Sequence, residues 1–258
     1  MAQSIGYLPL LGRSRFSLDA YRQLLADDAF WTSLRLTLRI AVVATVTSSV
    51  LAVAAALLIR STRRGRRAIT WLFQFNLTVP HIVGGGAMLL LLGQSGLLSR
   101  LTHAIGLTGS IQDFPPLVAD RWGFGILAEY VWKEVPFIGI VVLAVLAAGI
   151  EDLEDAARTL GAGPWQRFRF VVLPLLTPAL VSTSIIVFAF SFGAYEVPLL
   201  LGRSYPTTLP VLAYQNYVDV DLNARPEAMA IAVLIAVVIG LLVAVYLRLA
   251  ERYLARLR

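Results

Sequence analysis

Ser95 is the residue whose surroundings could support nucleophilic catalysis, since it lies in the tetrapeptide GQSG at positions 93–96. A serine nucleophile needs a histidine on a different helix within hydrogen-bond reach of its hydroxyl. The two histidines of the chain are His81 and His103, and His103 follows Ser95 by only eight residues, in an expected loop. A nucleophile without a positioned base is a weak catalytic signal. The tetrapeptide is therefore interpreted as a turn of small residues that ends a helix.

Other catalytic chemistries are limited by the residue types that are missing. The chain has no cysteine, which excludes a thiolate metal site, a cysteine nucleophile and a disulfide framework. The two histidines have no adjacent pair of acids, so no metal site is expected. The single lysine, Lys133 in WKEVP, does not follow the glycine-rich loop that binds nucleotide phosphates. We expect the chain to hydrolyse no ATP itself and to hold no cofactor of its own.

A few charged and aromatic residues could recognise a charged solute. Glu196 lies beside Tyr195 in FGAYEVPLL, directly after a long apolar run. A carboxylate next to aromatic rings suits a cationic solute, through charge and cation–π contact. It would equally suit an arginine of a partner protein. Trp132, Tyr195 and Glu196 are the candidate residues of the solute pathway. Lys133, the neighbour of Trp132, stands four residues after Glu129, a spacing that allows the two to pair on one helix face.

The segment TVPHIVGGGAM at 78–88 places helix-weakening residues inside an apolar run. Pro80, Gly84, Gly85 and Gly86 lower helix stability, and backbone groups freed in lipid must be satisfied by protein or by a water-filled cavity. A broken helix near the middle of the membrane would indicate a transport site. Close helix packing through small residues is the alternative, and the two are compatible.

The composition indicates that these residues are positioned by membrane helices. Hydrophobic residues make up 58% of the chain and charged residues only 15%, and the mean hydropathy is +0.74. Such values are too apolar for an ordinary soluble domain. Since about 20 mostly apolar residues cross a bilayer, we predict an all-α membrane protein with about five spans. The expected spans are residues 33–59, 68–92, 126–150, 171–192 and 228–247.

The arginines between the spans predict the orientation. RSTRRGRR at 60–67 holds five arginines and the tail at 248–258 holds four, whereas the loops at 93–125 and 196–227 carry two basic residues each. Basic loops stay in the cytoplasm, so we expect the loop at 151–170 and the C-terminus inside and the N-terminus outside. The net charge of +6 is interpreted in the same way, and no nucleic-acid partner is expected.

The N-terminal residues 1–32 do not have the pattern of a secretory signal, since no apolar segment follows a basic one. Within them, FSLDAYRQLLADDAFW at 16–31 has the apolar spacing of a short amphipathic helix. We expect this helix to lie along a membrane surface or to pack on its neighbours. The chain is thus divided into an N-terminal segment 1–32, a membrane domain 33–250 and a basic tail 251–258.

The polar stretch EDAARTLGAGPWQRFRFVVLPLL at 154–176 interrupts the apolar runs on the expected cytoplasmic side. Four acids from Glu151 to Asp155 crowd the start of a predicted helix, where the helix dipole favours negative charge. Gly161 is expected to cap its end. A short helix with alanines on its face could dock into the groove of a partner, and an ordinary surface loop is the alternative.

This stretch resembles the EAA loop of the permease subunits of binding-protein-dependent ABC importers. That pattern is E-A-A, three residues, G, nine residues, I, one residue, L-P. The present chain departs from it at two positions, where aspartate replaces glutamate and valine replaces isoleucine, and Glu154 could replace Asp155 in the acidic contact. The positions that match are Asp155, Ala156, Ala157, Gly161, Val171, Leu173 and Pro174.

The resemblance extends to residues 78–107 and 190–218 and implies a type I importer fold with a cytoplasmic coupling helix at about 151–161. That helix would sit in a groove of a separate ATPase, so ATP and magnesium would bind the partner. The residues implied in coupling are Glu154, Asp155, Ala156, Ala157, Arg158 and Gly161.

The implied partners are two ATP-binding subunits, a second permease that is identical or homologous, an extracytoplasmic solute-binding protein and the lipid of a bacterial inner membrane. The similarity favours the branch that carries polyamines, thiamine and ferric ion, and a polyamine-like cation is the expected cargo. The rival functions are a secondary transporter, which needs no ATPase, and an intramembrane serine protease built on Ser95.

Overall fold

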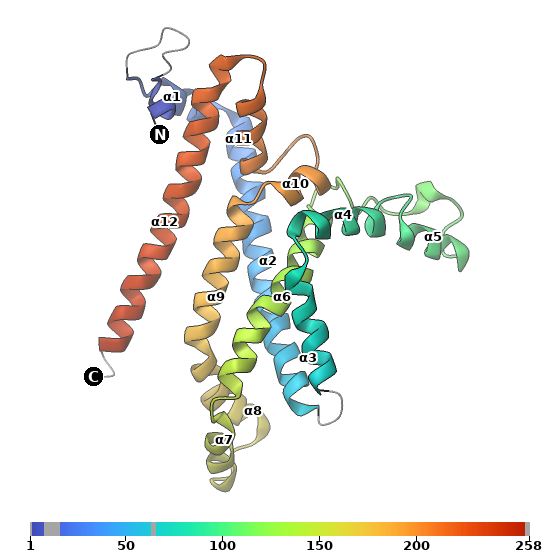
Figure 1. The fold of residues 1–258 in the computed structure, drawn as a ribbon, viewed down its shortest axis with the longest axis vertical. Helices are drawn as coiled ribbons and strands as arrows, with labels where there is room; N and C mark the ends of the chain where they lie inside the picture. The colour runs from blue at the N-terminus through green and yellow to red at the C-terminus, as the bar shows by residue number, and fades with distance from the viewer. Residues whose placement is uncertain (1, 8–15, 63–65, 256–258) are drawn as a thin grey trace. The chain divides into compact units, whose positions relative to one another are not determined.

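The computed structural model describes residues 2–7, 16–62 and 66–255, and the regular structure of these residues is entirely helical (Figure 1). Residues 63–65 of the basic segment and residues 256–258 of the tail lie outside the described residues. The elements, in chain order, are η1 (Ala2–Ile5), α1 (Asp19–Ala26), α2 (Asp28–Ser61), α3 (Arg66–Phe75), η3 (Asn76–Thr78), α4 (His81–Leu92), α5 (Leu97–Ala104), η4 (Ile111–Asp113), α6 (Phe124–Leu146), α7 (Ile150–Thr159), α8 (Pro164–Arg167), the π-helical η5 (Phe168–Val172), α9 (Leu173–Gly193), α10 (Glu196–Leu201), α11 (Leu209–Val218), η6 (Leu222–Ala224) and α12 (Arg225–Ala255).

Four helical stretches are long and apolar enough to cross a membrane, and the bent pair of α6 and α7 would make a fifth. The helices α2, α6, α9 and α12 confirm four of the predicted spans as helices, with ends that differ by a few residues. The runs in α2, α9 and α12 are apolar over enough length to cover the hydrocarbon thickness, whereas α6 contains Glu129, Lys133 and Glu134 and reaches that length only together with α7.

The span predicted over 68–92 is broken next to Pro80, as the sequence indicates, but its bounds differ from those in the structure. The helix α3 ends at Phe75, a 3₁₀ turn follows, and α4 begins only at His81. Pro80 has no amide hydrogen and pushes the preceding residue out of the helical region, and Val79 is indeed extended, with ψ 122°. The three glycines that the sequence also marks as helix-breaking, Gly84, Gly85 and Gly86, lie inside α4 instead. The stretch with enough apolar length here is 81–104, which joins α4 and α5.

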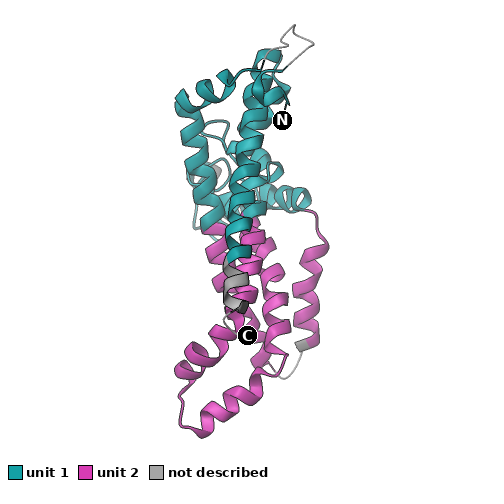
Figure 2. Ribbon diagram, turned by 90° about the vertical axis from the view of Figure 1, so that its left-hand side faces the viewer, with its two compact units in different colours: residues 1–42, 81–129, 189–258 teal, residues 43–80, 130–188 magenta. Residues whose placement is uncertain are grey.

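The contacts within the chain divide it into two compact units, coloured separately in Figure 2. Unit 1 holds residues 1–42, 81–129 and 189–258. Its core lies where α1, α11 and the first part of α12 meet, and the buried residues there are Ala20, Leu24, Phe30, Leu209, Ala230 and Ile231. The Tyr21 hydroxyl bonds the Ser4 hydroxyl at 3.0 Å. The N-terminal amphipathic helix therefore packs on its neighbours, the second of the two arrangements that the sequence allows.

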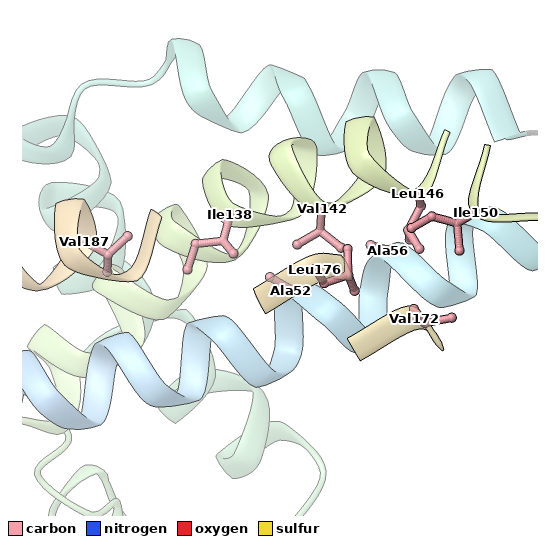
Figure 3. Close-up of a cluster of buried hydrophobic side chains, with 9 residues drawn as sticks. All are labelled: Ala52, Ala56, Ile138, Val142, Leu146, Ile150, Val172, Leu176 and Val187. Carbon is pink, nitrogen blue, oxygen red and sulfur yellow. The ribbon is translucent and has the colours of Figure 1, made fainter. Parts of the chain in front are cut away.

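Unit 2 holds residues 43–80 and 130–188 and contains α3, α7, α8 and the adjoining parts of α2, α6 and α9. Ala52 and Ala56 let the other helices approach α2 closely, and the Ser49 and Ser184 hydroxyls bond at 2.9 Å between α2 and α9. Figure 3 shows the side chains of α6 pointing into this cluster, whose members are Ala52, Ala56, Ile138, Val142, Leu146, Ile150, Val172, Leu176 and Val187. Ile150 is the first residue of α7 and also belongs to this core, so the core holds the start of α7 in place.

Candidate functional site

The helix α7 begins with a sharp change of direction after α6. The two helices are bent by 62° across residues 147–149. Gly149 makes this bend possible because it has a φ of +90°, which a side chain would disfavour. Glu151 and Asp152 lie in the first turn of α7, where their charge is stabilised by the helix dipole.

The end of α7 is capped as the sequence predicts. Gly161 has a φ of +86°, and its amide donates to the Arg158 carbonyl at 3.0 Å. The Ala162 amide donates to the Ala157 carbonyl, also at 3.0 Å. These two bonds form a Schellman motif, in which a residue in the left-handed conformation satisfies the last carbonyls of a helix. The Gln166 side chain then accepts the Gly163 amide at 2.8 Å, so the connection to α8 is also held by hydrogen bonds.

The acids of α7 differ in how far their side chains are exposed to solvent. Glu154 forms an ion pair with Arg60 at the end of α2, and both side chains are only 17% exposed. Glu151 lies 3.5 Å from the same guanidinium, but its side chain is 72% exposed. Asp155 and Arg158 pair with each other at 3.2 Å, and both are 65% exposed. Glu154 is thus engaged inside unit 2, whereas Asp155 is the acid of the matched motif that is presented to solvent.

The outer face of this region is unusually apolar for a polar turn. Leu160 is 88% exposed, Phe170 73% and Trp165 70%. An open hollow lies among them, lined by Ala157, Leu160, Gly161, Ala162, Gln166, Arg167, Phe170 and Val171. Figure 1 shows α7 and α8 at the ends of α6 and α9. Exposed apolar side chains gathered around a hollow are typical of a protein-binding surface.

The predicted pathway residues belong to different units. In unit 1, the rings of Tyr195 and Tyr214 stack with centroids 5.2 Å apart, and Glu196 begins α10 beside them. Both tyrosines are about two-fifths exposed. In unit 2, Trp132 is 39% exposed, and its ring lies 6.0 Å from the Lys133 ammonium.

The glycines of α4 allow close helix packing, which is one of the two explanations that the sequence leaves open for them. A methyl group added at Gly85 would stand 3.3 Å from the Leu200 side chain of α10. Gly84 is also buried, whereas nothing lies within 4 Å of the corresponding position at Gly86. Two of the three glycines thus face protein.

Two backbone carbonyls at the helix break at 76–80 accept hydrogen bonds from a side chain that the sequence does not single out for this role. The Lys133 ammonium donates to the carbonyls of Asn76 and Val79 at 2.7 and 2.5 Å. The Asn76 side-chain amide donates to the Trp132 carbonyl. Pro80 was the one local signal that carbonyls would be left free here.

An acidic residue and a histidine of unit 1 meet at the start of α4. The Glu129 carboxylate, which is fully buried, lies 3.2 Å from Nδ1 of His81. The imidazole also packs on Phe190 with ring centroids 4.3 Å apart. His81 is thereby tied to α6 and α9.

The tetrapeptide at 93–96 forms the turn between α4 and α5. The Gly96 amide donates to the Gly93 carbonyl, and the Ser95 carbonyl accepts the Arg100 side chain at 3.1 Å. Nδ1 of His103 lies 2.9 Å from the Thr108 carbonyl. Within the residues that the structure describes, no three histidines or acids are placed to hold a metal ion.

Comparison with known proteins assigns this chain to a family. Residues 35–256 match the family described as binding-protein-dependent transport system inner membrane component. The putrescine transport system permease protein PotI of Escherichia coli K12 is 30% identical over 86% of this chain and 73% of its own length. The molybdenum transport system permease protein ModB of Mycobacterium tuberculosis H37Rv is 32% identical over 85% of this chain and 80% of its own.

Solved structures agree on the fold. A bacterial ABC transporter that imports the acidic polysaccharide alginate has a chain of TM-score 0.80 and 19% identity, covering 97% of this chain and 87% of that one. An inward-facing MetNI methionine ABC transporter has a TM-score of 0.60 and 20% identity, over 85% of this chain and 94% of that one. The chain therefore belongs to the family of binding-protein-dependent inner-membrane transport components and is a permease subunit of an ABC importer.

Proposed function

We propose that α7 is the coupling helix of this permease and docks into a groove of a separate ATP-binding subunit. The observation that carries the proposal is the outer face of α7: a capped helix that presents Asp155, Arg158 and Leu160 beside an open hollow lined by both apolar and polar residues. Such a face buries well against a partner, since apolar contacts supply affinity and the exposed charges select orientation. Glu154 supports the helix from inside, and Ala156 and Ala157 let a partner's backbone come close.

The proposed assembly contains two ATP-binding subunits, a second permease and an extracytoplasmic solute-binding protein. ATP and magnesium bind the ATPase subunits, and their closure moves the permease helices between outward-open and inward-open states. A related alginate transporter was crystallised with a periplasmic protein bound to an alginate pentasaccharide, which supports this kind of assembly. The arginine count supports an orientation with α7 and the C-terminus in the cytoplasm and the N-terminus outside.

Isolating the tagged protein from its native membrane tests this assembly. We expect an ATP-hydrolysing subunit and a homologous or identical permease to copurify, and a solute-binding protein to join when its solute is present. Mass spectrometry of the solute retained by that binding protein identifies the cargo. A purified, transport-competent chain without any ATPase would contradict the proposal and would favour a secondary transporter.

The proposed cargo is a small cation of the polyamine type. Glu196 places a carboxylate beside the stacked rings of Tyr195 and Tyr214, a combination that attracts a cation through charge and through the ring faces. The similarity to a putrescine permease supports this choice. Thiamine and ferric ion remain the alternatives within the class, and molybdenum and trehalose/maltose permeases are also among the relatives.

Replacing Glu196 with glutamine is expected to raise the KM for putrescine uptake about tenfold, equivalent to about 1.4 kcal/mol of lost attraction. The amide keeps the shape of the side chain and removes its charge, so the kcat should change much less. Uptake of labelled putrescine by vesicles that contain the whole transporter measures both constants.

The matched control is Asp19→Asn, which removes an exposed acid in α1 and should leave the KM unchanged. If Glu196→Gln transports putrescine with an unaltered KM, the carboxylate does not select the cation. If wild-type vesicles accumulate molybdate or a disaccharide instead, the polyamine assignment fails and the coupling proposal stands.

A further inference from the structure

The chain enters α7 through an open glycine and leaves it through a hydrogen-bonded turn. On one side lies the bend at 147–149, where Gly149 has a positive φ and nothing within 4 Å of its Cα substituent position. On the other side, nothing lies within 4 Å of the Gly161 substituent position, but the Schellman bonds and the bond from Gly163 to Gln166 hold the chain there. Glycine hinges rotate easily because no side chain restricts them. The connection to α6 through Gly149 is therefore the weaker of the two, and a direct contact between α7 and a span would transmit a push better.

Arg60 supplies such a contact. Its guanidinium bonds Glu154 through Nη2 at 2.5 Å and lies 3.5 Å from Glu151 through Nε. The two acids are three residues apart, so they share one face of α7, and a single planar guanidinium can reach both. Ile150, directly before them, is 4% exposed and packs in the same core as Ala56 of α2.

The position of Arg60 makes this contact favourable. Arg60 lies in the last turn of α2, where the helix dipole stabilises a cation, and Glu151 lies in the first turn of α7, where it stabilises an anion. The Arg60 and Glu154 side chains are each 17% exposed, so solvent screens their attraction less than that of a surface pair. The bond joins segments that are 94 residues apart in the chain.

The helix that Arg60 ends is a membrane span. Residues 40–59 of α2 contain no charged side chain, and 20 residues of helix extend about 30 Å, the thickness of the hydrocarbon layer. The helix runs without interruption from Asp28 to Ser61. Residues 43–61 of this helix lie within unit 2, as α7 does, so a displacement at Arg60 is passed along this part of the span.

We propose that Arg60 is a positioning residue that fastens the coupling helix to α2, so that the movement of the ATPase is delivered to this span directly through Glu151 and Glu154. The inference rests on the proposed docking of α7 and adds the route that the force takes inside the permease. The Asp155–Arg158 pair faces the partner, and the Arg60 cluster faces the membrane domain.

The test is a double-mutant cycle in the complete transporter, reconstituted with its ATPase and binding protein. Arg60→Gln should leave the ATPase bound and hydrolysing ATP, and should lower the solute taken up per ATP about tenfold, within the range of coupling energies for a contacting pair. Glu154→Gln should have the same effect, and the double variant should be no worse than either single one. Arg60→Lys, which keeps the charge and loses the planar fork, should recover part of the coupling.

The control is Arg22→Gln, which removes an exposed arginine that pairs with Asp19 in α1 and should change nothing. Wild-type coupling in Arg60→Gln with the ATPase still bound would overturn the proposal. So would losses that multiply in the double variant, because they would show that the two side chains act separately.

A second measurement separates the fastening from the docking. The chain has no native cysteine, so spin labels on Leu58→Cys and Thr159→Cys report the distance between α2 and α7 without interference. We expect a narrow distance distribution with Arg60 and a broad one with Arg60→Gln. An unchanged distribution would refute the fastening even if the ATPase docks, and absence of any ATPase from the wild-type complex would refute the docking alone.

Discussion

Replacing Gly161 with tryptophan is expected to lower the solute transported per ATP by at least about tenfold while the spans stay folded. Two effects combine. The φ of +86° is unfavourable for any residue with a Cβ, by roughly 1–2 kcal/mol, so the Schellman cap would be strained. In addition, Gly161 lines the open hollow beside Leu160 and Phe170, and an indole there would occupy the surface that is proposed to receive the ATPase. Parallel assays of ATP hydrolysis and solute uptake in proteoliposomes measure the ratio.

Two further variants separate these effects. Gly161→Asn should retain most of the coupling, because asparagine tolerates the left-handed conformation and is small. Gly163→Ala should behave as wild type, since Gly163 has a φ of −69° and an added methyl group would meet only the Gln166 side chain at 3.7 Å. Wild-type coupling in Gly161→Trp, with substrate-stimulated hydrolysis intact, would argue against α7 as the docking element.

Local signals were sufficient to predict four of the five spans as helices and the shape of α7. The apolar runs of α2, α9 and α12 are each long enough to cross a bilayer, and no tertiary information is needed to recognise them. Gly161 marked the end of α7 because a C-cap is formed by residues adjacent in sequence. The spacing from Asp155 to Pro174 likewise depends only on the order of residues, and the family match over 35–256 agrees with it.

The contacts that hold the site together could not be predicted in this way, because they join distant parts of the chain. Arg60 meets Glu154 across 94 residues, and His81 meets Glu129 across 48. From the sequence, Glu154 looked like a substitute for Asp155 in a partner contact, and only the fold shows that it faces Arg60 instead. The break at 76–80 was predicted from Pro80, but the three glycines expected to contribute to it lie inside α4. Whether a glycine weakens a helix depends on what packs against it, and Gly85 packs against Leu200.

That break leads to the largest expected effect on stability, which is the replacement of Lys133 with methionine. Lys133 is 4% exposed, and its ammonium donates to the Asn76 and Val79 carbonyls, which are freed where the helix ends before Pro80. Methionine has a similar length and no donor. Each hydrogen bond to a charged group is worth about 1.5–3 kcal/mol, and buried carbonyls inside a membrane have no water to replace it. We expect a loss of roughly 3 kcal/mol and a fall of about 10 °C in the unfolding midpoint in detergent.

The control for this change is Arg203→Met, which removes the same charge at an exposed position and should leave the midpoint unaltered. Lys133→Arg distinguishes the role of the charge from that of the shape, since guanidinium can donate to both carbonyls but is larger than the ammonium it replaces. We therefore expect a smaller fall than for methionine. If Lys133→Met instead unfolds at the wild-type temperature, water or neighbouring side chains satisfy the two carbonyls. The break at 76–80 then borders a water-filled cavity and is not sealed from water by protein packing. That outcome would make the break itself a candidate part of the solute pathway, because unpaired backbone at membrane depth is tolerated only where it lines water or protein.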